Sequence, residues 1–207
     1  DDNGAWEAIL ENAYDIIVTG EINGEDTLTF SIPFRDSKRK YLENEKKIQI
    51  VDDIYKVRTI TDVKDSTGNT VTQVYAEAEF YDLTFSVRKE EKKFDAEMAD
   101  VAMAYALADT EWSVGTVNVT SKRTWTSSEK NALSILRSVA NLHGGDLVFD
   151  CPNRLVHLLT VNGKDSGALF AYKKNMKSIE RVVDTRSLVT RLYATGANGM
   201  TFADING

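Results

Sequence analysis

The feature that most constrains this chain is a series of short alternating segments in its first ninety residues. The stretch TLTFSI (27–32) places Leu28, Phe30 and Ile32 on one side of an extended backbone. Similar segments occupy 15–22, 47–51, 55–62, 70–78 and 80–87. Turn signals such as Asn23-Gly24 and 66–69 separate them. Short strands at this spacing are typical of an antiparallel barrel or sandwich. Pro33 is expected to end its strand or to place it at a sheet edge.

The pattern changes near Lys89, where the charged stretch RKEEKKF suggests a boundary. A helix is predicted over 95–108 and a strand over 112–120. A second helix is predicted to follow a capping box formed by Thr126 and Glu129, and to stop at Gly144-Gly145. Its apolar stripe consists of Ala132, Ile135, Leu136, Val139, Ala140 and His143. Strands are predicted at 146–150, 155–161 and 168–172, which together indicate a small α/β unit.

The chain returns to a β pattern after Asn175. A strand is predicted over 178–184, followed by a hairpin formed by 190–194 and 200–203 around the turn at 197–199. The order β, α/β, β predicts an α+β fold that is mainly β. We expect an N-terminal β domain at 1–92, an inserted α/β domain at 93–175, and the start of a second β domain at 176–207.

Charge and cysteine content exclude several classes of protein. The 207 residues carry a formal net charge of -7, which argues against a protein that grips nucleic acid through a basic surface, although DNA passing through a wide lumen remains compatible. Cys151 is the only cysteine, so neither an intramolecular disulfide nor a thiolate metal cluster can form. No apolar run approaches the roughly 20 residues that span a bilayer.

Candidate catalytic residues are few. His143 ends the second predicted helix, where an imidazolium would complement the helix dipole. Cys151 and His157 could meet across a turn as a nucleophile and its base. We favour a turn cysteine and a strand histidine, because no orienting motif accompanies the pair. Carboxylate pairs suited to glycosidase chemistry can arise by chance among 32 acidic residues. We therefore assign no catalytic residue.

Binding motifs are equally sparse. The stretch 62–69 (DVKDSTGN) lacks the spacing and closing glutamate of an EF-hand and is interpreted as a turn. Lys38-Arg39-Lys40 and Lys173-Lys174 could contact a phosphate or an acidic partner, but solvated loop lysines are the favoured interpretation. Trp112 and Trp125 could stack on a sugar, although packing is favoured. We expect no cofactor-binding residue and no metal site.

Several local patterns, taken in order, resemble one family. The patterns are EINGEDTLTFSIPF, DDIYKVRTITD, YAEAEFYDLTF, ADTEWSVG with Thr110, Trp112, Val114 and Gly115, the Gly144–Asp150 element GGDLVFD, and KKNMKSIERVVDTRSLVTRLYATGANGMTFADING. Together they are similar to the phage minor structural proteins also called prophage endopeptidase tail proteins, or tail-associated lysins, of long-tailed phages. The resemblance covers nearly the whole chain.

The resemblance implies a fold and a role. In the related baseplate hub proteins, two barrel-like β domains per subunit close into a trimeric, pseudo-sixfold ring. With 190–207 opening the second barrel, this chain would be either an N-terminal hub fragment, with further chain after Gly207, or an unusually short member of the family. A first Met and an initial strand would precede Asp1. The implied partners are two further copies, the distal tail protein and the tape measure protein, with DNA only passing through the lumen. The implied location is the virion tail tip, assembled in the host cytoplasm.

Two other functions remain open at this stage. The family name invites a cell-wall endopeptidase, although the lytic domain of such proteins lies C-terminal to the hub. A module that binds surface glycans is the second alternative, with Trp112 and Trp125 as its candidates. No membrane binding by this chain is expected.

Overall fold

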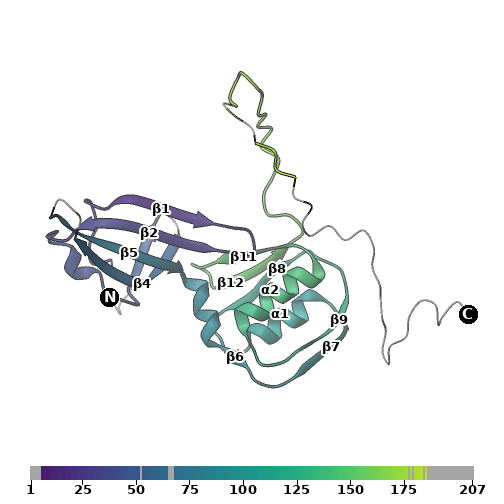
Figure 1. Cartoon of the computed structure of the whole chain (residues 1–207). Helices are drawn as coiled ribbons and strands as arrows, with labels where there is room; N and C mark the ends of the chain where they lie inside the picture. The colour runs from purple at the N-terminus through teal and green to yellow at the C-terminus, as the bar shows by residue number, and fades with distance from the viewer. Residues whose placement is uncertain are drawn as a thin grey trace, which may run out of the picture. The chain divides into compact units, whose positions relative to one another are not determined.

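The computed structural model describes residues 6–51, 53–64, 68–176, 178, 180–183 and 185 (Figure 1). The chain divides into two compact units, residues 1–163 and residues 164–207. Each unit is described below by itself. None of the helices in the described part of the chain has the length and apolar character that crossing a membrane would require.

The first unit begins with a curled antiparallel sheet of five strands in the order β1-β2-β5-β4-β3 (Figure 1). We call residues 14–78 the β lobe. Its strands are β1 (Tyr14–Gly20), β2 (Asp26–Pro33), β3 (Lys47–Ile50), β4 (Asp53–Lys64) and β5 (Thr70–Ala78), with the short 3-10 helix η1 (Arg39–Tyr41) before β3. This arrangement confirms the mainly β fold predicted from the alternating pattern, and it leaves β1 and β3 at the edges of the sheet.

The alternation in β2 explains the position of the core. Leu28, Phe30 and Ile32 are buried, whereas Thr29 between them is exposed. Val74 on β5 lies directly opposite Phe30, so the buried side chains of neighbouring strands share one face. Pro33 is the last residue of β2, and β2 lies inside the sheet rather than at its edge. Pro33 therefore ends its strand, as one of the two predictions stated, and does not mark a sheet edge.

The strand predicted over 80–87 is wrong. The chain forms the 3-10 helix η2 (Glu79–Phe85) and then the two-residue strand β6 (Val87–Arg88). Phe80 and Leu83 are the buried apolar residues of η2, and their spacing of three matches a helical turn rather than an alternating strand. Because polar and aromatic residues are mixed in 79–85, the sequence pattern did not distinguish this helical spacing from a strand.

We call residues 87–159 the α/β lobe. Its remaining elements are β7 (Lys92–Glu97), α1 (Ala99–Leu107), β8 (Ser113–Val117), β9 (Arg123–Ser127), β10 (Lys130–Asn131), α2 (Ala132–His143), β11 (Asp146–Asp150) and β12 (Leu155–Leu159). Strand β12 pairs antiparallel with β11 and parallel with β8. The helices α1 and α2 lie side by side next to this three-stranded sheet (Figure 1).

Both helices begin later than the sequence predicted. Residues 95–97 belong to β7, so α1 starts at Ala99. Thr126 lies in β9, opposite Lys93, and cannot cap α2. The cap is Asn131, whose side chain accepts a hydrogen bond from the Ser134 amide at 2.8 Å. The predicted stop is confirmed, because Gly144 adopts a positive φ of 80° at the end of α2.

One apolar core runs through both lobes of the first unit. Phe80 of η2 stacks on Phe149 of β11 with ring centroids 3.9 Å apart. Phe149 in turn meets the edge of the buried Trp112 ring. The charged stretch at 88–94, which suggested a boundary, carries β7 and the buried Phe94. The division of the chain at 92 and 175 stays a prediction.

The second unit contains no strand among its described residues. The strands predicted over 168–172 and 178–184 are absent from the described part of those ranges, which holds one isolated bridge between Tyr172 and Met176. Asn175 organises this turn, since its side chain accepts from the Ala171 amide and donates to the Leu169 carbonyl, both at 2.8 Å. An isolated strand needs a partner to satisfy its backbone, and the described residues of this unit supply none. The predicted hairpin at 190–203 lies outside the described residues.

Candidate interaction surface

The edge strand β1 exposes an unusual number of apolar side chains. Tyr14, Ile16, Ile17 and Val18 are between 41% and 58% exposed. Every residue of this strand is exposed, although its sequence is among the most apolar of the sheet. Proteins normally protect such edges with charges or a covering segment, because an unpaired edge is a template for another chain. Strand β1 is therefore suited to contact a partner.

A largely apolar groove of about 920 Å³ is lined by the N-terminal segment, by β3 and by single residues of β1, β2 and β4. Its lining includes Ile16 of β1, Phe30 of β2, and Ile48 and Ile50 of β3. Trp6 and other residues of the N-terminal segment also line it. The sequence did not reveal this groove, because its lining comes from strands that are distant in the sequence.

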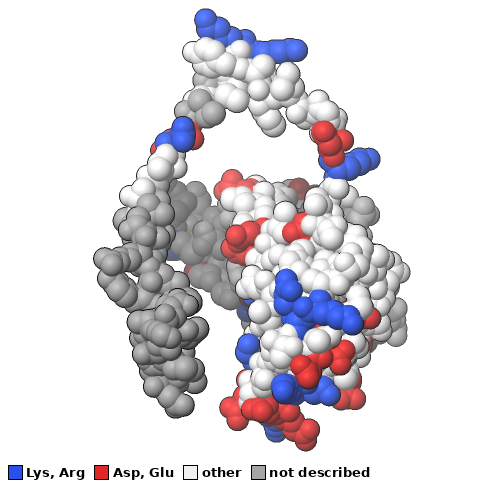
Figure 2. Space-filling model, turned by 90° about the vertical axis from the view of Figure 1, so that its right-hand side faces the viewer, with Lys and Arg blue, Asp and Glu red and all other residues white. Residues whose placement is uncertain are grey.

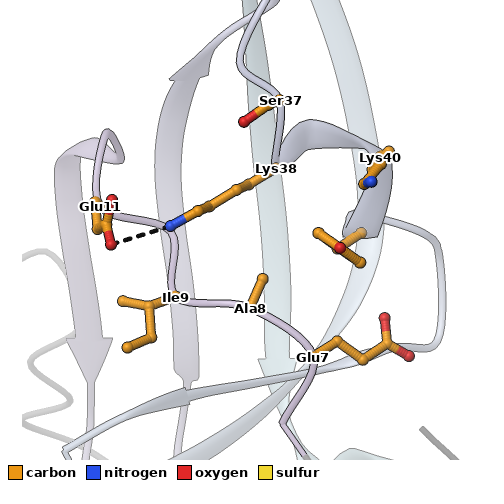
Figure 3. Close-up of a pocket in the computed structure, with 8 residues that line it drawn as sticks. Glu7, Ala8, Ile9, Glu11, Ser37, Lys38 and Lys40 are labelled. Atoms are coloured by element: carbon orange, nitrogen blue, oxygen red, sulfur yellow. Dashed lines mark ion pairs between the residues drawn. The ribbon is translucent and has the colours of Figure 1, made fainter.

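Ion pairs hold the N-terminal segment 6–13 against the β lobe. Lys38 binds Glu11 with an N–O distance of 3.1 Å, as Figure 3 shows. Lys46 binds Glu7 at 3.0 Å, and this hydrogen bond holds the pKa of the Glu7 carboxyl below its usual value. The smaller hollow beside these residues measures about 390 Å³ and has lysine and glutamate side chains around it. Lys38 and Arg39, predicted to be solvated, are thus engaged in ion pairs, Arg39 with Asp62.

The turn between β1 and β2 joins the two lobes. The Asn23 side chain donates to the Gly145 carbonyl at 3.0 Å and accepts from the Leu147 amide at 2.7 Å. Arg137 of α2 donates to the Gly24 carbonyl at 2.8 Å. Asn23 has a positive φ of 60°, a conformation that asparagine tolerates better than most residues. The sequence showed a turn here but not its contacts.

Glu79 makes a second connection between the β lobe and the α/β lobe. Its side chain is only 2% exposed and binds Lys47 of β3 at 2.7 Å and Arg154 of the β11–β12 turn at 2.9 Å. Arg154 also lies over the Trp112 ring, 5.5 Å from its centroid. A buried carboxylate needs such partners, because desolvation without them is costly. Glu79 therefore fixes the end of the β lobe to the α/β lobe.

Cys151 and His157, the disfavoured candidates for a nucleophile and its base, do not form a catalytic arrangement. Within the described residues no hydrogen bond joins Cys151 and His157. The His157 Nδ1 atom accepts a hydrogen bond from the Thr116 amide at 2.8 Å, so this nitrogen is engaged with the neighbouring backbone. Burial, together with the negative charge of Glu79, raises the pKa of the Cys151 thiol to about 11. A thiol with such a pKa is a poor nucleophile at neutral pH.

The other candidate residues serve packing. Trp112 is buried, and Trp125 stacks on Phe94 with centroids 4.8 Å apart, so packing, the favoured interpretation, holds for both. His143 lies at the end of α2 as predicted, but its ring is buried and its Nδ1 lies 2.9 Å from the Ser121 carbonyl oxygen.

Charge on the described surface is mixed. In Figure 2, acidic and basic side chains lie beside one another on the visible face of the first unit. Lys173 lies over the ring of its neighbour Tyr172. Among the residues that the structure describes, no group of three or more His, Cys, Asp or Glu side chains is placed to hold a metal ion. The apolar edge and groove are therefore the main candidates for function.

This architecture, a curled antiparallel sheet joined to a small α/β lobe, is similar in fold to two solved prophage tail proteins. The prophage tail protein gp18 from Listeria monocytogenes EGD-e has a TM-score of 0.71 to this chain at 15% identity, over 94% of this chain and 61% of that one. The 43 kDa tail protein of prophage MuSo2 from Shewanella oneidensis has a TM-score of 0.52 at 13% identity, over 74% and 50%. No curated protein matches the chain.

Three family models match the sequence in order along the chain. They are the prophage endopeptidase tail N-terminal domain at 1–78, the prophage endopeptidase tail domain at 86–158, and the prophage endopeptidase tail at 164–207. The chain belongs to the prophage endopeptidase tail family, as its motifs indicated. It spans 61% and 50% of the two solved tail proteins.

Proposed function

We propose that this chain is a structural subunit of the tail tip, and that it forms the N-terminal part of a trimeric baseplate hub. Family membership and fold support the coarser role of a phage tail structural protein. The observation that carries the finer proposal is the open sheet, whose edge strand β1 exposes four large apolar side chains. Edges of this kind are covered in an assembly, and obligate interfaces are large and apolar.

In this proposal the ring joins the tail tube, through the distal tail protein, to the tip, and it carries lytic or receptor-binding domains C-terminal to the hub. The tape measure protein is the second proposed partner, and DNA passes through the lumen without being gripped. The net charge of -7 supports passage rather than binding, because a protein that grips DNA needs a basic surface to displace counterions. The protein would be assembled in the bacterial cytoplasm and reside in the virion.

Binding to the distal tail protein tests this proposal. The chain is mixed with the purified distal tail ring protein, and light scattering on a size-exclusion column gives the mass of the complex. We expect three copies of the chain per ring. A chain that elutes separately from the ring protein at all concentrations, or that binds with another stoichiometry, would overturn the hub proposal.

We further propose that the region described here has no catalytic activity of its own. The raised pKa of Cys151 and the occupied Nδ1 atom of His157 support this. The test is incubation with purified peptidoglycan. Release of soluble fragments that disappears in Cys151→Ser or His157→Ala would favour the endopeptidase function instead.

A further inference from the structure

The N-terminal segment 6–13 is held near each of its ends by an ion pair. Lys46 pairs with Glu7 at 3.0 Å, and Lys38 pairs with Glu11 at 3.1 Å, the second of which Figure 3 shows. The two lysine side chains are 36% and 30% exposed, so water and salt reach both pairs. Salt screens the attraction between exposed charges, and ionic strength should therefore weaken both attachments.

The polar partners of the segment lie in one connection of the β lobe. Lys38 and Lys46 belong to residues 34–46, which join β2 to β3. Asp36 of the same connection accepts a hydrogen bond from the Asn12 side chain at 2.7 Å. These side chains fasten the segment to a connection between strands rather than to the strands themselves.

The backbone of the segment is not part of the sheet. Among the described residues, the backbone of 8–13 makes no hydrogen bond to a strand. Its one backbone hydrogen bond is internal and runs from the Ala13 amide to the Leu10 carbonyl at 3.1 Å. The segment can therefore move away without breaking a ladder of the sheet, whose first strand begins at Tyr14.

Apolar contacts hold the segment only in part. Its two largest apolar side chains, Trp6 and Ile9, are 55% and 75% exposed. Leu10 and Ala13 pack against the core but are themselves only partly buried. Because burial of apolar area is small here, the ion pairs supply a substantial share of the attachment.

We propose that the N-terminal segment acts as a strap along the groove, closed by its two ion pairs and opened when salt screens them. The segment supplies part of the groove lining, and Leu42, Ile48 and Ile50 supply part of the remainder. When the segment leaves, these apolar side chains lose that cover and meet water. Ionic strength thus sets how much apolar surface the β lobe presents. This inference goes beyond the proposed hub and does not depend on it.

The expected effect is moderate. An exposed ion pair changes an equilibrium by about 1.4-fold to fivefold, so loss of both pairs should change the ratio of open to closed chains by about 2-fold to 25-fold. The measurement must therefore report on the segment itself rather than on global stability.

The test follows Trp6, which lines the groove, by fluorine NMR of the chain labelled with 5-fluorotryptophan. The chain has three tryptophans, and Trp6→Phe assigns the signal of Trp6. The other two lie in the α/β lobe, where Trp112 is buried and Trp125 stacks on Phe94. Their signals serve as internal references that each variant is folded.

The unaltered chain is compared with the double variant Lys38→Met/Lys46→Met, which lacks both ion pairs but retains apolar side chains of similar length. Sodium chloride is raised from about 0.1 M to about 1 M, over which the screening length falls from about 10 Å to about 3 Å. We expect the Trp6 signal of the unaltered chain to move with salt toward its position in the double variant. The signals of Trp112 and Trp125 should stay in place.

Asp109→Asn is the matched control. It removes an exposed ion pair of the α/β lobe, which joins Asp109 to Arg88 at 3.4 Å. Asparagine also tolerates the positive φ of 57° at this position. The control should leave the Trp6 signal and its salt dependence unchanged. An equal shift in the control and in the double variant would overturn the proposal, because the effect would not come from the two pairs of the segment.

Binding of the dye ANS measures whether opening exposes apolar surface. At low salt we expect stronger dye fluorescence for the double variant than for the unaltered chain or the control. The proposal is overturned if the Trp6 signal is the same in the unaltered chain and the double variant, or if it does not respond to salt. It is equally overturned if the Trp6 signal moves but dye binding does not rise.

Discussion

The side chain of Asn23 is hydrogen-bonded to the backbone amide of Leu147, 124 residues later in the chain, at 2.7 Å. The same side chain donates to the Gly145 carbonyl. A hairpin turn of the β lobe thus completes the backbone hydrogen bonding at the start of β11 in the α/β lobe. Because the bonds are partly buried, water does not readily replace them, and the turn acts as a connection between the lobes.

Replacement of Asn23 should measure this connection. Asn23→Gly keeps the positive φ accessible and removes both hydrogen bonds, so we expect a loss of about 1–3 kcal/mol in the free energy of unfolding. Asn23→Ala should lose about 1–2 kcal/mol more, because alanine is strained in the left-handed region. Urea unfolding measures both. Asn12→Ala is the control, since its side chain makes an exposed hydrogen bond to Asp36. Equal stability of the Gly variant and the unaltered chain would contradict the connection.

The sequence predicted features that depend on neighbouring residues, but not contacts between residues far apart in the chain. The alternation of Leu28, Phe30 and Ile32 predicted a strand with these side chains buried, because a period of two is a local property of the sequence. The Asn23-Gly24 turn was also predicted from the local sequence. Its contacts with Gly145 and Leu147 were not predicted, because no local sequence pattern identifies a partner in another lobe.

The errors have a common physical cause. Phe80 and Leu83 follow a helical period, but one turn is too short to distinguish from a strand by pattern alone. Thr126 and Glu129 match a capping box, yet pairing of β9 with β7 took Thr126 into a sheet and left Asn131 as the cap. The groove could not be predicted, because its lining combines the N-terminal segment with strands that are distant in the sequence. The pattern at 15–22 predicted a strand but did not indicate that its apolar side chains would be exposed.

Glu79 should be among the most sensitive charged positions. Removing this buried carboxylate in Glu79→Ala breaks both of its ion pairs, and Arg154 then keeps only the exposed Glu111 at 3.4 Å. We expect a loss of about 2–3 kcal/mol, below the roughly 3–5 kcal/mol for fully buried pairs, because both cations keep some contact with water. Glu79→Gln should lose less, since it retains an acceptor. Chemical denaturation provides the measurement.

The matched control for Glu79 is Glu43→Ala. Glu43 pairs with Lys46 at 3.6 Å and is 64% exposed, so its removal should change stability by less than about 0.5 kcal/mol. A similar effect at both positions would show that Glu79 does not join the lobes.

Gly115 is predicted to be intolerant of a side chain. A Cβ atom at this position would lie 2.6 Å from the Cε1 and Nδ1 atoms of His157. Gly115→Ala should therefore lower the free energy of unfolding by about 1–3 kcal/mol through overpacking. In the double variant Gly115→Ala/His157→Ala the clash is removed, so the two losses should be less than additive.

Gly20→Ala is the control for this cycle, because nothing lies within 4 Å of its Cβ position. Thermal unfolding of the four cycle members and the control gives the coupling energy. Strict additivity of Gly115→Ala and His157→Ala would mean that the backbone moves away from the histidine and that the close approach has no energetic consequence.

The Cys151 thiol should react slowly in the folded protein. With a pKa of about 11, its thiolate fraction at pH 8 is on the order of a hundredfold smaller than that of an ordinary cysteine with a pKa near 8.5. Burial disfavours the charged form, so alkylation by iodoacetamide should rise about tenfold per pH unit up to the pKa. Mass spectrometry gives the rate in the native and urea-unfolded states. Rapid native alkylation at pH 7 would show an activated thiol, and it would return Cys151 to consideration as a nucleophile.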